Sequence, residues 1–156
     1  MNKLWILSGR IAFWVCWPLL WVYLRFGRSR TRVIVIADGK IILVKGWLSD
    51  GKWSLPGGGL HRQEPAIDGA KRELQEETGI TIQNNQLQQV NEGWVSSAGL
   101  RYRHVAFLAQ IAKPHKLKKQ WLEVTEVEWI ELSMVCEKPE VSQETKQILR
   151  ASNTVD

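Results

Sequence analysis

Short apolar segments separated by turn residues run through the chain from residue 32 onward. RVIVIA (residues 32–37) and KIILVKG (Lys40–Gly46) lie on either side of Asp38-Gly39, a dipeptide typical of a β-hairpin turn. Ser142 is a suitable N-cap for a last helix, which we expect to run to about Ala151. Further apolar segments predict strands at residues 53–56, 102–111 and 124–132.

A helical pattern lies between these strands. Ala66–Thr78 consists of good helix formers, Pro65 suits a first helical position, and Gly79 suits the left-handed residue that ends a helix. Strands interrupted by two helices predict an α/β fold with a mixed sheet between helical layers. We expect one domain over residues 32–151, followed by a short tail, residues 152–156.

The first 31 residues follow a different pattern, a hydrophobic helix with an arginine-rich linker. IAFWVCWPLLWVYL (residues 11–24) contains no charge, and residues 4–26 contain only Arg10 and Arg25. A bilayer requires about 20 apolar residues to cross, and Trp14, Trp17 and Trp21 suit interfacial depths. This segment therefore predicts a single membrane-spanning helix.

Three other interpretations of this segment stay open: an interfacial helix, a helix packed on the domain, and a cleaved signal peptide. The last lacks a small-residue cleavage site. The positive-inside rule compares Lys3 with the arginines that follow the segment, and it places the domain on the cytoplasmic side of a membrane. Those arginines are Arg25, Arg28, Arg30 and Arg32.

The net charge of +5 comes from this same N-terminal region. Six of the 21 basic residues precede residue 33, and no acid precedes Asp38, so the remaining 15 basic residues face 16 acids. A nucleic-acid-binding function based on overall charge therefore has no support.

Candidate chemistry is concentrated in the predicted helix and the turn before it. Glu73, Glu76 and Glu77 fall within one arc of the helix, next to an apolar stripe that we expect to face a core. Such acids commonly form only a solvated face. Here Gly57-Gly58-Gly59 precedes them, and such a loop lets backbone groups approach a metal ion or phosphate. Hard oxygen ligands favour Mg²⁺ or Mn²⁺.

Residues 58–80, GGLHRQEPAIDGAKRELQEETGI, fill every fixed position of the pattern G-x5-E-x7-R-E-U-x-E-E-x-G-U, where U is aliphatic. This segment resembles the Nudix box, the signature of hydrolases that cleave nucleoside diphosphates linked to another moiety. The resemblance implies the Nudix-type α/β/α sandwich with a mixed β-sheet. It also implies a pyrophosphohydrolase that requires Mg²⁺ or Mn²⁺.

The resemblance also implies residue roles. Glu76 and Glu77 are expected as metal ligands with the carbonyl of Gly57, and Glu73 as a further ligand or the catalytic base. Arg72 is expected to orient a box glutamate through a bidentate pair. The residues expected to shape the loop and the helix ends are Gly58, Glu64 and Gly79. An acid outside the box often completes such a site, and the sequence does not choose among Glu92, Glu123, Glu126 and Glu128.

Substrate-binding residues are less defined. NEGWVSSAGLR (residues 91–101) is predicted as a long loop in which Trp94 and Arg101 present an aromatic face and a charge to a substrate. The alternative is an ordinary surface loop. Residues 113–119 form a basic turn, for which a solvated charge run is the simpler interpretation.

These features predict a membrane-anchored Nudix hydrolase that cleaves a diphosphate linkage in a nucleoside diphosphate derivative by metal-assisted attack of water. Nucleoside triphosphates and oxidised nucleotides are the favoured substrates, followed by nucleotide sugars, capped RNA ends and lipid-linked pyrophosphates. The rival hypothesis is a catalytically silent Nudix-fold module that binds a nucleotide at the membrane.

Overall fold

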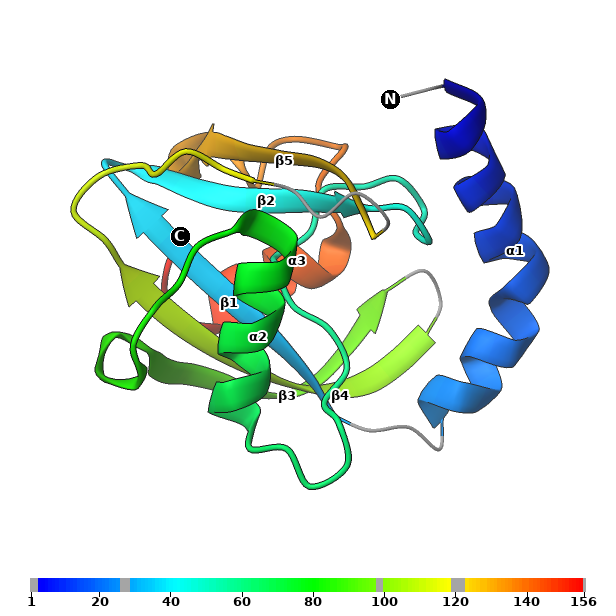
Figure 1. Ribbon diagram of the computed structural model, residues 1–156, viewed down its shortest axis with the longest axis horizontal. Helices are drawn as coiled ribbons and strands as arrows, with labels where there is room; N and C mark the ends of the chain where they lie inside the picture. Colours follow the sequence, from blue (N-terminus) through cyan, green and yellow to red (C-terminus); the bar gives the residue numbers. More distant parts are fainter. Residues whose placement is uncertain (1–2, 26–28, 98–99, 119–122, 156) are drawn as a thin grey trace.

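The computed structural model describes residues 3–25, 29–97, 100–118 and 123–155. One sheet has the strand order β3-β4-β1-β2-β5. Strand β1 pairs with β4 in parallel, and the other neighbours pair antiparallel. The predicted mixed sheet is therefore confirmed (Figure 1). Its strands are β1 Arg30–Ala37, β2 Lys40–Gly46, β3 Gln88–Ser97, β4 Leu100–Gln110 and β5 Val124–Glu131.

Two helices cover the two faces of this sheet (Figure 1). Helix α2, Ala66–Thr78, packs Leu74 into one core cluster with Val33 and Val35 of β1. Helix α3, Gln143–Ala151, packs Ile148 into the other cluster with Ile34. Because neighbouring residues of a strand point to opposite faces, the two clusters lie on opposite sides of the sheet. The α/β/α sandwich is confirmed. Two short 3₁₀ turns, η1 Asn84–Gln86 and η2 Leu132–Met134, lie between these elements.

Local sequence signals set the helix ends largely as expected. Gly79 ends α2 with a φ of 76°, in the left-handed region, and its N–H bonds the carbonyl of Gln75. The Ser142 side chain accepts a hydrogen bond from the N–H of Thr145 and so caps α3. Pro65 is the N-cap of α2 and not its first helical residue.

Strands β1 and β2 pair only next to their connecting turn, and the loop that precedes α2 lies against the rest of β1. Asp38 and Gly39 have φ values of 47° and 73°, as a tight turn of this kind requires. The first half of β1 bonds the loop instead of β2: the N–H of Thr31 donates to the carbonyl of Gly58 and that of Val33 to Pro56, each at 2.9 Å. The loop that precedes α2 is thereby fixed against the central strand. The predicted strand at residues 53–56 reduces to isolated bridges from Trp53 and Ser54.

The predicted loop at residues 91–101 is wrong within the described residues. Most of it belongs to β3 and to the start of β4, with Trp94 opposite Arg103 and Val95 opposite Tyr102. Because β3 lies at the edge of the sheet, polar side chains are accommodated along it, and they concealed its strand character. Residues 98 and 99 lie outside the described residues.

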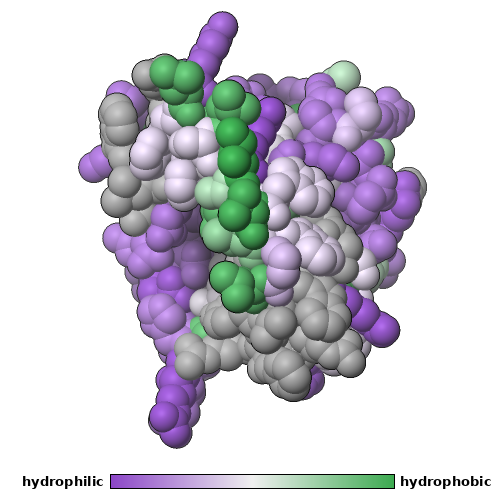
Figure 2. Space-filling view, turned by 90° about the vertical axis from the view of Figure 1, so that its right-hand side faces the viewer, coloured by the Kyte–Doolittle hydropathy of each residue, from purple (hydrophilic) through white to green (hydrophobic). Residues whose placement is uncertain are grey.

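Helix α1, Lys3–Arg25, packs against the domain on one side. Trp5 stacks on Trp47 at 4.9 Å between ring centroids, the backbone of Gly9 lies against Trp47, and Phe13 is buried. On its outer side α1 carries a row of exposed apolar side chains, which Figure 2 shows from the side of this helix. Large hydrophobic residues exposed on it are Leu4, Trp5, Leu7, Ile11, Trp14, Val15 and Leu19.

The prediction of a single-pass membrane anchor is wrong. Within residues 3–25, 29–97, 100–118 and 123–155, no helix combines the length and the apolar composition needed to cross a bilayer. Although α1 has 23 residues, Arg10 and Pro18 interrupt its apolar sequence. The membrane location derived from this helix is therefore also wrong.

The arginines assigned to a membrane flank have another place. Arg30 and Arg32 belong to β1 and lie at least partly inside the domain, because β1 begins two residues earlier than predicted. Arg28, Phe26 and the side chain of Arg25 lie outside the described part of the chain. The positive-inside argument therefore counted two charges that the fold uses internally.

Candidate active site

The glycine loop lies directly against α2 and β1. Gly57 has a φ of 138°, and a side chain there would clash with the carbonyl oxygen of Thr31. A methyl group on Gly58 would collide with the carboxylate of Glu73. Only glycine permits this close approach, so the loop and the acidic helix form one structural unit.

A hydrogen bond from the backbone joins Glu77 to this unit. Its carboxylate accepts from the N–H of Gly57 at 2.8 Å. Burial raises the pKa of Glu77 to about 8, and the nearby charge of Glu73 adds to this, whereas the Gly57 hydrogen bond and the Arg32 charge act in the opposite direction. This carboxylate therefore lacks enough compensating positive charge where it lies.

Arg72 joins the other carboxylates of the motif. Its Nε and Nη2 donate to the two oxygens of Glu64 at 2.9 and 3.1 Å, which is a bidentate pair. Its Nη1 donates to Glu73 at 2.9 Å and to Glu76 at 3.1 Å, and its Nη2 also reaches the carbonyl of Gly59 at 3.2 Å. One guanidinium therefore forms hydrogen bonds with three acidic side chains and with the glycine loop.

The two ends of this network differ in charge compensation. The hydrogen bonds from Arg72, together with the backbone N–H of His61, lower the pKa of Glu64 to about 2. Burial raises the pKa of Glu73, although Arg72 acts against this shift. Glu64 is thus a saturated structural acid, whereas burial disfavours the ionised forms of Glu73 and Glu77.

The oxygen donors at this end have the chemistry that Mg²⁺ and Mn²⁺ prefer. They are the carboxylates of Glu73, Glu76 and Glu77, from one face of α2, and the carbonyl of Gly57. Among the described residues, no group of three or more acidic, histidine or cysteine side chains converges on a common point. Arg72 binds Glu73 and Glu76 instead, and Glu77 binds the Gly57 N–H, so the donor set fits by chemical type and requires side-chain movement to close around a cation.

A buried polar network supports the loop from the α3 side, and no local sequence pattern marks it. Arg32 donates through Nε to Glu144 of α3 at 2.6 Å, through Nη2 to Tyr102 at 3.1 Å, and through Nη1 to the carbonyl of Gly57 at 2.5 Å. The side chains of Arg32 and Glu144 are only 8% and 3% exposed. This network fixes the peptide of Gly57, whose N–H faces Glu77.

The electrostatics of this network are balanced. Burial alone would lower the pKa of Arg32, but Glu144 and Tyr102 outweigh it and raise that pKa. Burial likewise acts to raise the pKa of Glu144, and Arg32 reverses the direction. The pKa of Tyr102 is raised to about 12, mainly by burial. Both members of the ion pair are therefore charged over the whole working pH range.

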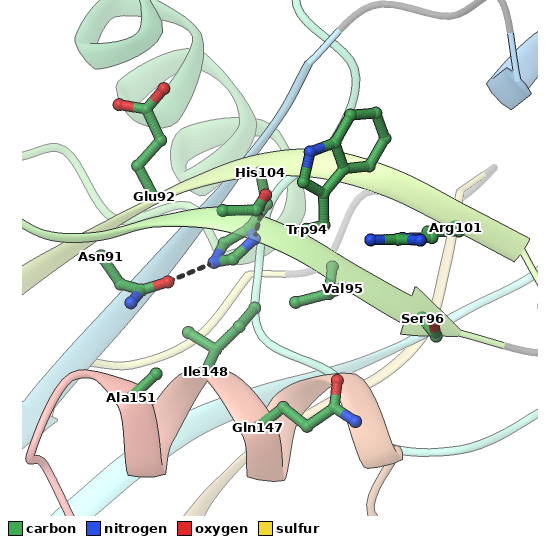
Figure 3. Close-up of a pocket in the computed structure, with 11 residues that line it drawn as sticks. Asn91, Glu92, Trp94, Val95, Ser96, Arg101, His104, Gln147, Ile148 and Ala151 are labelled. Atoms are coloured by element: carbon green, nitrogen blue, oxygen red, sulfur yellow. Dashed lines mark hydrogen bonds between the residues drawn. The ribbon is translucent and has the colours of Figure 1, made fainter.

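A pocket of about 580 Å³ lies beside this network, between β3 and α3 (Figure 3). His104, Asn91 and Val95 line its sheet side, and Gln147 lines its helix side. Because His104 is the strand partner of Arg30, the pocket begins one strand away from the start of β1. The pocket and the acidic helix thus lie on two sides of the same end of β1.

Trp94 and Arg101, predicted to contact substrate, also line this pocket, and the structure brings them together. The Arg101 guanidinium lies over the Trp94 ring, 5.4 Å from its centroid. The neighbouring Val95 points into the α3-side core, so the Trp94 ring points away from α3, as Figure 3 shows. The two side chains therefore lie at the rim of the pocket, and Trp94 is 62% exposed.

His104 is a buried neutral member of the pocket wall. Its Nδ1 lies 3.0 Å from the carbonyl oxygen of Gly93 and its Nε2 lies 2.7 Å from the Oδ1 atom of Asn91. Burial lowers the pKa of His104, so one ring nitrogen carries the proton. With Nδ1–H donating to Gly93, the Asn91 amide satisfies Nε2 when its NH₂ group faces the ring.

The remaining predicted residues lie in ordinary surroundings. Glu92 pairs with Arg103, and Glu126 pairs with Lys45 at 3.0 Å. Neither Glu123 nor Glu128 is selected as the additional acid. Of the basic turn, residues 113–118 are mostly exposed, and Lys119 lies outside the described residues.

The comparisons with known proteins agree with this architecture. A family model of the NUDIX domain matches residues 27–151. The chain therefore belongs to the NUDIX domain family, and the resemblance seen in residues 58–80 is confirmed.

One curated relative and two solved structures show how far the similarity extends. An RNA pyrophosphohydrolase of Xylella fastidiosa is 37% identical over 71 residues, which are 46% of this chain and 34% of that protein. The matched region thus spans about a third of that relative's length.

The solved structures are similar in fold. A MutT NUDIX hydrolase from Burkholderia pseudomallei has a TM-score of 0.66 at 21% identity, covering 83% of this chain and 98% of that one. A bifunctional NMN adenylyltransferase/ADP ribose pyrophosphatase from Francisella tularensis, complexed with AMP and a manganese ion, has a TM-score of 0.70 at 22% identity. That match covers 91% of this chain and 46% of the other.

Proposed function

We propose that this protein is a metal-dependent Nudix hydrolase that cleaves a diphosphate linkage in a nucleoside diphosphate derivative. The observation that carries the proposal is the position of Glu77 and Glu73. Glu77 accepts a hydrogen bond from Gly57, and Glu73 fills the space that a side chain at Gly58 would need. Acids with raised pKa values packed against a glycine loop are characteristic of a catalytic site rather than of a solvated helix face.

Mg²⁺ or Mn²⁺ would be held by Glu73, Glu76, Glu77 and the carbonyl of Gly57. A divalent cation in this position supplies positive charge to phosphoryl oxygens and increases the acidity of water. The carbonyl of Gly57 has two lone pairs, so its bond to Arg32 leaves one free. The solved structure from Francisella tularensis, which contains a manganese ion, supports the choice of metal.

Other residues of this chain would orient the acids, accept a proton and support the loop. Arg72 orients Glu73 through a 2.9 Å hydrogen bond and connects it to Glu64, which is fixed in the loop. Glu73, whose pKa is raised by burial, is suited to accept a proton from the attacking water. The Arg32–Glu144 pair holds the Gly57 peptide in place from behind.

The substrate proposal combines the pocket with the relatives. The pocket beside β3 is large enough to hold part of a nucleotide, and Trp94 and Arg101 at its rim suit stacking on a base and contact with a phosphate. Nucleoside triphosphates, including oxidised ones, were favoured from the sequence. The similarity to an RNA pyrophosphohydrolase adds the triphosphorylated 5′ end of RNA as a second substrate of equal standing.

The test is a turnover assay with Mg²⁺ or Mn²⁺ across a panel of diphosphate substrates. The panel contains nucleoside triphosphates, 8-oxo-dGTP, ADP-ribose, a nucleotide sugar, a dinucleoside tetraphosphate and a 5′-triphosphorylated RNA oligonucleotide. We expect hydrolysis of at least one member, and we expect Glu77→Gln to lower its kcat by at least ~100-fold, as for loss of a charge-stabilising or proton-transfer group.

Glu137→Gln is the matched control, because Glu137 is an exposed glutamate outside the motif. Its turnover should equal that of the wild type. If the panel members bind but none is hydrolysed, the chain is a nucleotide-binding module and the proposed activity is wrong. Turnover that is unchanged in Glu77→Gln would place the reaction elsewhere.

A further inference from the structure

Arg30 lies between the acidic helix and the pocket. It is the first residue of β1, it forms an antiparallel bridge with Gly59 of the glycine loop, and on its other side it is the strand partner of His104 in the pocket wall. Its guanidinium lies over the Tyr102 ring, 5.4 Å from the centroid. The backbone of Arg30 therefore connects the two parts of the candidate site, and its side chain lies against Tyr102 between them.

The Arg30 side chain lacks an acidic partner and a hydrogen-bond partner for its Nε among the described residues. Its Nε is fully buried and has no hydrogen-bond partner among the described residues. Within the part of the chain that the structure describes, ten ion pairs occur, and Arg30 takes part in none of them. Buried arginines in proteins are normally paired with an acid or an anion, because an uncompensated charge is costly to bury.

Arg32, two residues further along β1, has the opposite environment. It uses all three guanidinium nitrogens on Glu144, Tyr102 and Gly57. Glu144 is thereby occupied and does not form an ion pair with Arg30. The pKa of Arg30 is lowered by burial and further by the positive charge of Arg32, and the acids nearby do not compensate.

The acids of α2 and Arg30 contact the same loop: Arg30 forms a bridge with Gly59, and the neighbouring glycines lie against Glu73 and Glu77. A divalent cation held by the acids and a phosphate group held by Arg30 would supply the opposite charge to the carboxylates and to the guanidinium. A guanidinium offers a fork of donors that matches two phosphate oxygens.

We propose that Arg30 is a substrate-binding residue that grips the phosphate group lying between the cation on α2 and the part of the substrate in the β3–α3 pocket. This inference rests on the proposed diphosphate hydrolase activity, whose site it extends. Arg30 would bind ground state and transition state alike through a phosphate that is present in both. Its loss therefore raises KM more than it lowers kcat.

The alternative is that Arg30 only screens the acids of α2. In that case its removal would strengthen or weaken cation binding, and any cation at position 30 would serve equally well. Phosphate binding requires more than charge, because lysine lacks the planar fork of donors. Measurements on phosphate and on metal separately can therefore distinguish the two roles.

The experiment uses the full chain and two probes, inorganic pyrophosphate and α,β-methylene-ADP, titrated by calorimetry in the presence of Ca²⁺. Arg30→Gln should weaken binding of both probes by at least ~10-fold, the scale of a lost hydrogen bond to a charged group. Arg30→Lys should recover only part of this loss. Arg150→Gln, an exposed arginine in the last turn of α3, is the matched control and should bind as the wild type does.

Mn²⁺ affinity of the same proteins, measured without phosphate, gives the second readout. It should change by less than about threefold in Arg30→Gln. Probe affinities equal to those of the wild type, or full recovery by Arg30→Lys together with altered Mn²⁺ affinity, would overturn the proposal. So would a wild-type protein that binds neither probe at millimolar concentration.

Turnover on the substrate panel separates this inference from the proposed function. If the wild type hydrolyses a substrate and Arg30→Gln has the same KM, the hydrolase stands and the role of Arg30 is wrong. If no substrate is hydrolysed and probe binding still depends on Arg30, the phosphate site stands and the hydrolase proposal is wrong.

Discussion

Two regions of this site contain similar charged residues and use them differently. In the supporting region, Arg32 with Glu144 and Arg72 with Glu64 form pairs whose donors and acceptors are satisfied. In the region of the proposed cation site, burial disfavours the charged forms of Glu73, Glu77 and Arg30, and the nearby opposite charges do not outweigh it. The difference lies in the partners available and not in the residue types.

This contrast distinguishes, within one motif, a glutamate that stabilises the loop from a glutamate proposed to bind a cation. Glu64 and Glu77 are both glutamates of the same box, yet the pKa of one is lowered to about 2 and that of the other is raised to about 8. A saturated pair stabilises the loop, whereas a carboxylate without a strong partner has the properties expected of the proposed cation ligand. Substitutions in the two regions should therefore affect different observables.

The largest effect on stability is expected from the supporting region. Glu144→Ala leaves Arg32 as a buried unpaired charge, and breaking such a pair typically costs about 3–5 kcal/mol. Urea denaturation should show this loss in the free energy of unfolding, with the m-value unchanged. Glu137→Ala, at an exposed glutamate, is the control and should stay within about 0.5 kcal/mol of the wild type. A loss of under 1 kcal/mol in Glu144→Ala would show that the network does not support the fold.

A smaller effect, on activity, is expected from the glycine loop. Gly58→Ala places a methyl group against the carboxylate of Glu73, whose flexible side chain should move while the fold is kept. Displacing a catalytic group by about 1 Å can cost on the order of 100-fold in rate. We expect a loss of ~10–100-fold in kcat, with the melting temperature nearly unchanged.

The neighbouring Gly59→Ala is a close control for that substitution. A methyl group at Gly59 meets nothing within 4 Å, and Gly59 is not among the glycines with positive φ. Its activity should stay close to that of the wild type. Equal losses in the two variants would indicate that the loop needs flexibility rather than contact with Glu73.

The smallest effect, on the pH dependence of stability, distinguishes the two regions directly. The folded pKa of Glu64 is lowered, so its contribution is present above about pH 4.5 and is lost as the pH falls toward 2. The folded pKa of Glu77 is raised, so its contribution is present below about pH 4.5 and is lost as the pH rises toward 8.

Thermal unfolding without divalent cations, followed from pH 3 to pH 9, measures both the acid limb, where stability falls below about pH 4.5, and the decline of stability above about pH 4.5. Glu64→Gln should flatten the acid limb, and Glu77→Gln should flatten the decline from about pH 4.5 to pH 8. If Glu77→Gln leaves that decline unchanged, Glu77 is not an uncompensated carboxylate in the metal-free protein.

The sequence predicted those parts of the fold and site that depend on residues close together in the chain. The caps of α2 and α3, the Asp38-Gly39 turn and the contact of the glycine loop with α2 all follow from local spacing. The partners of Arg32 could not be predicted, because Glu144 is 112 residues away and no local pattern marks it. Arg30 was counted as a flanking charge for the same reason.

Two errors have a physical origin in composition. The polar residues of β3 resemble a loop because the strand lies at the sheet edge, where its side chains stay exposed. Helix α1 was assigned to a membrane because its apolar residues were counted without regard to the side that contacts the domain. Trp5 and Phe13 pack on the domain.

Binding of Mn²⁺ to the full-length chain, followed by the electron paramagnetic resonance signal of the free ion, tests the central claim most directly. We expect saturable uptake by the wild type and by Glu137→Gln, and affinity at least ~10-fold weaker in Glu77→Gln. Absence of uptake by the wild type, or equal affinity in Glu77→Gln, would contradict a cation site formed by α2 and the glycine loop.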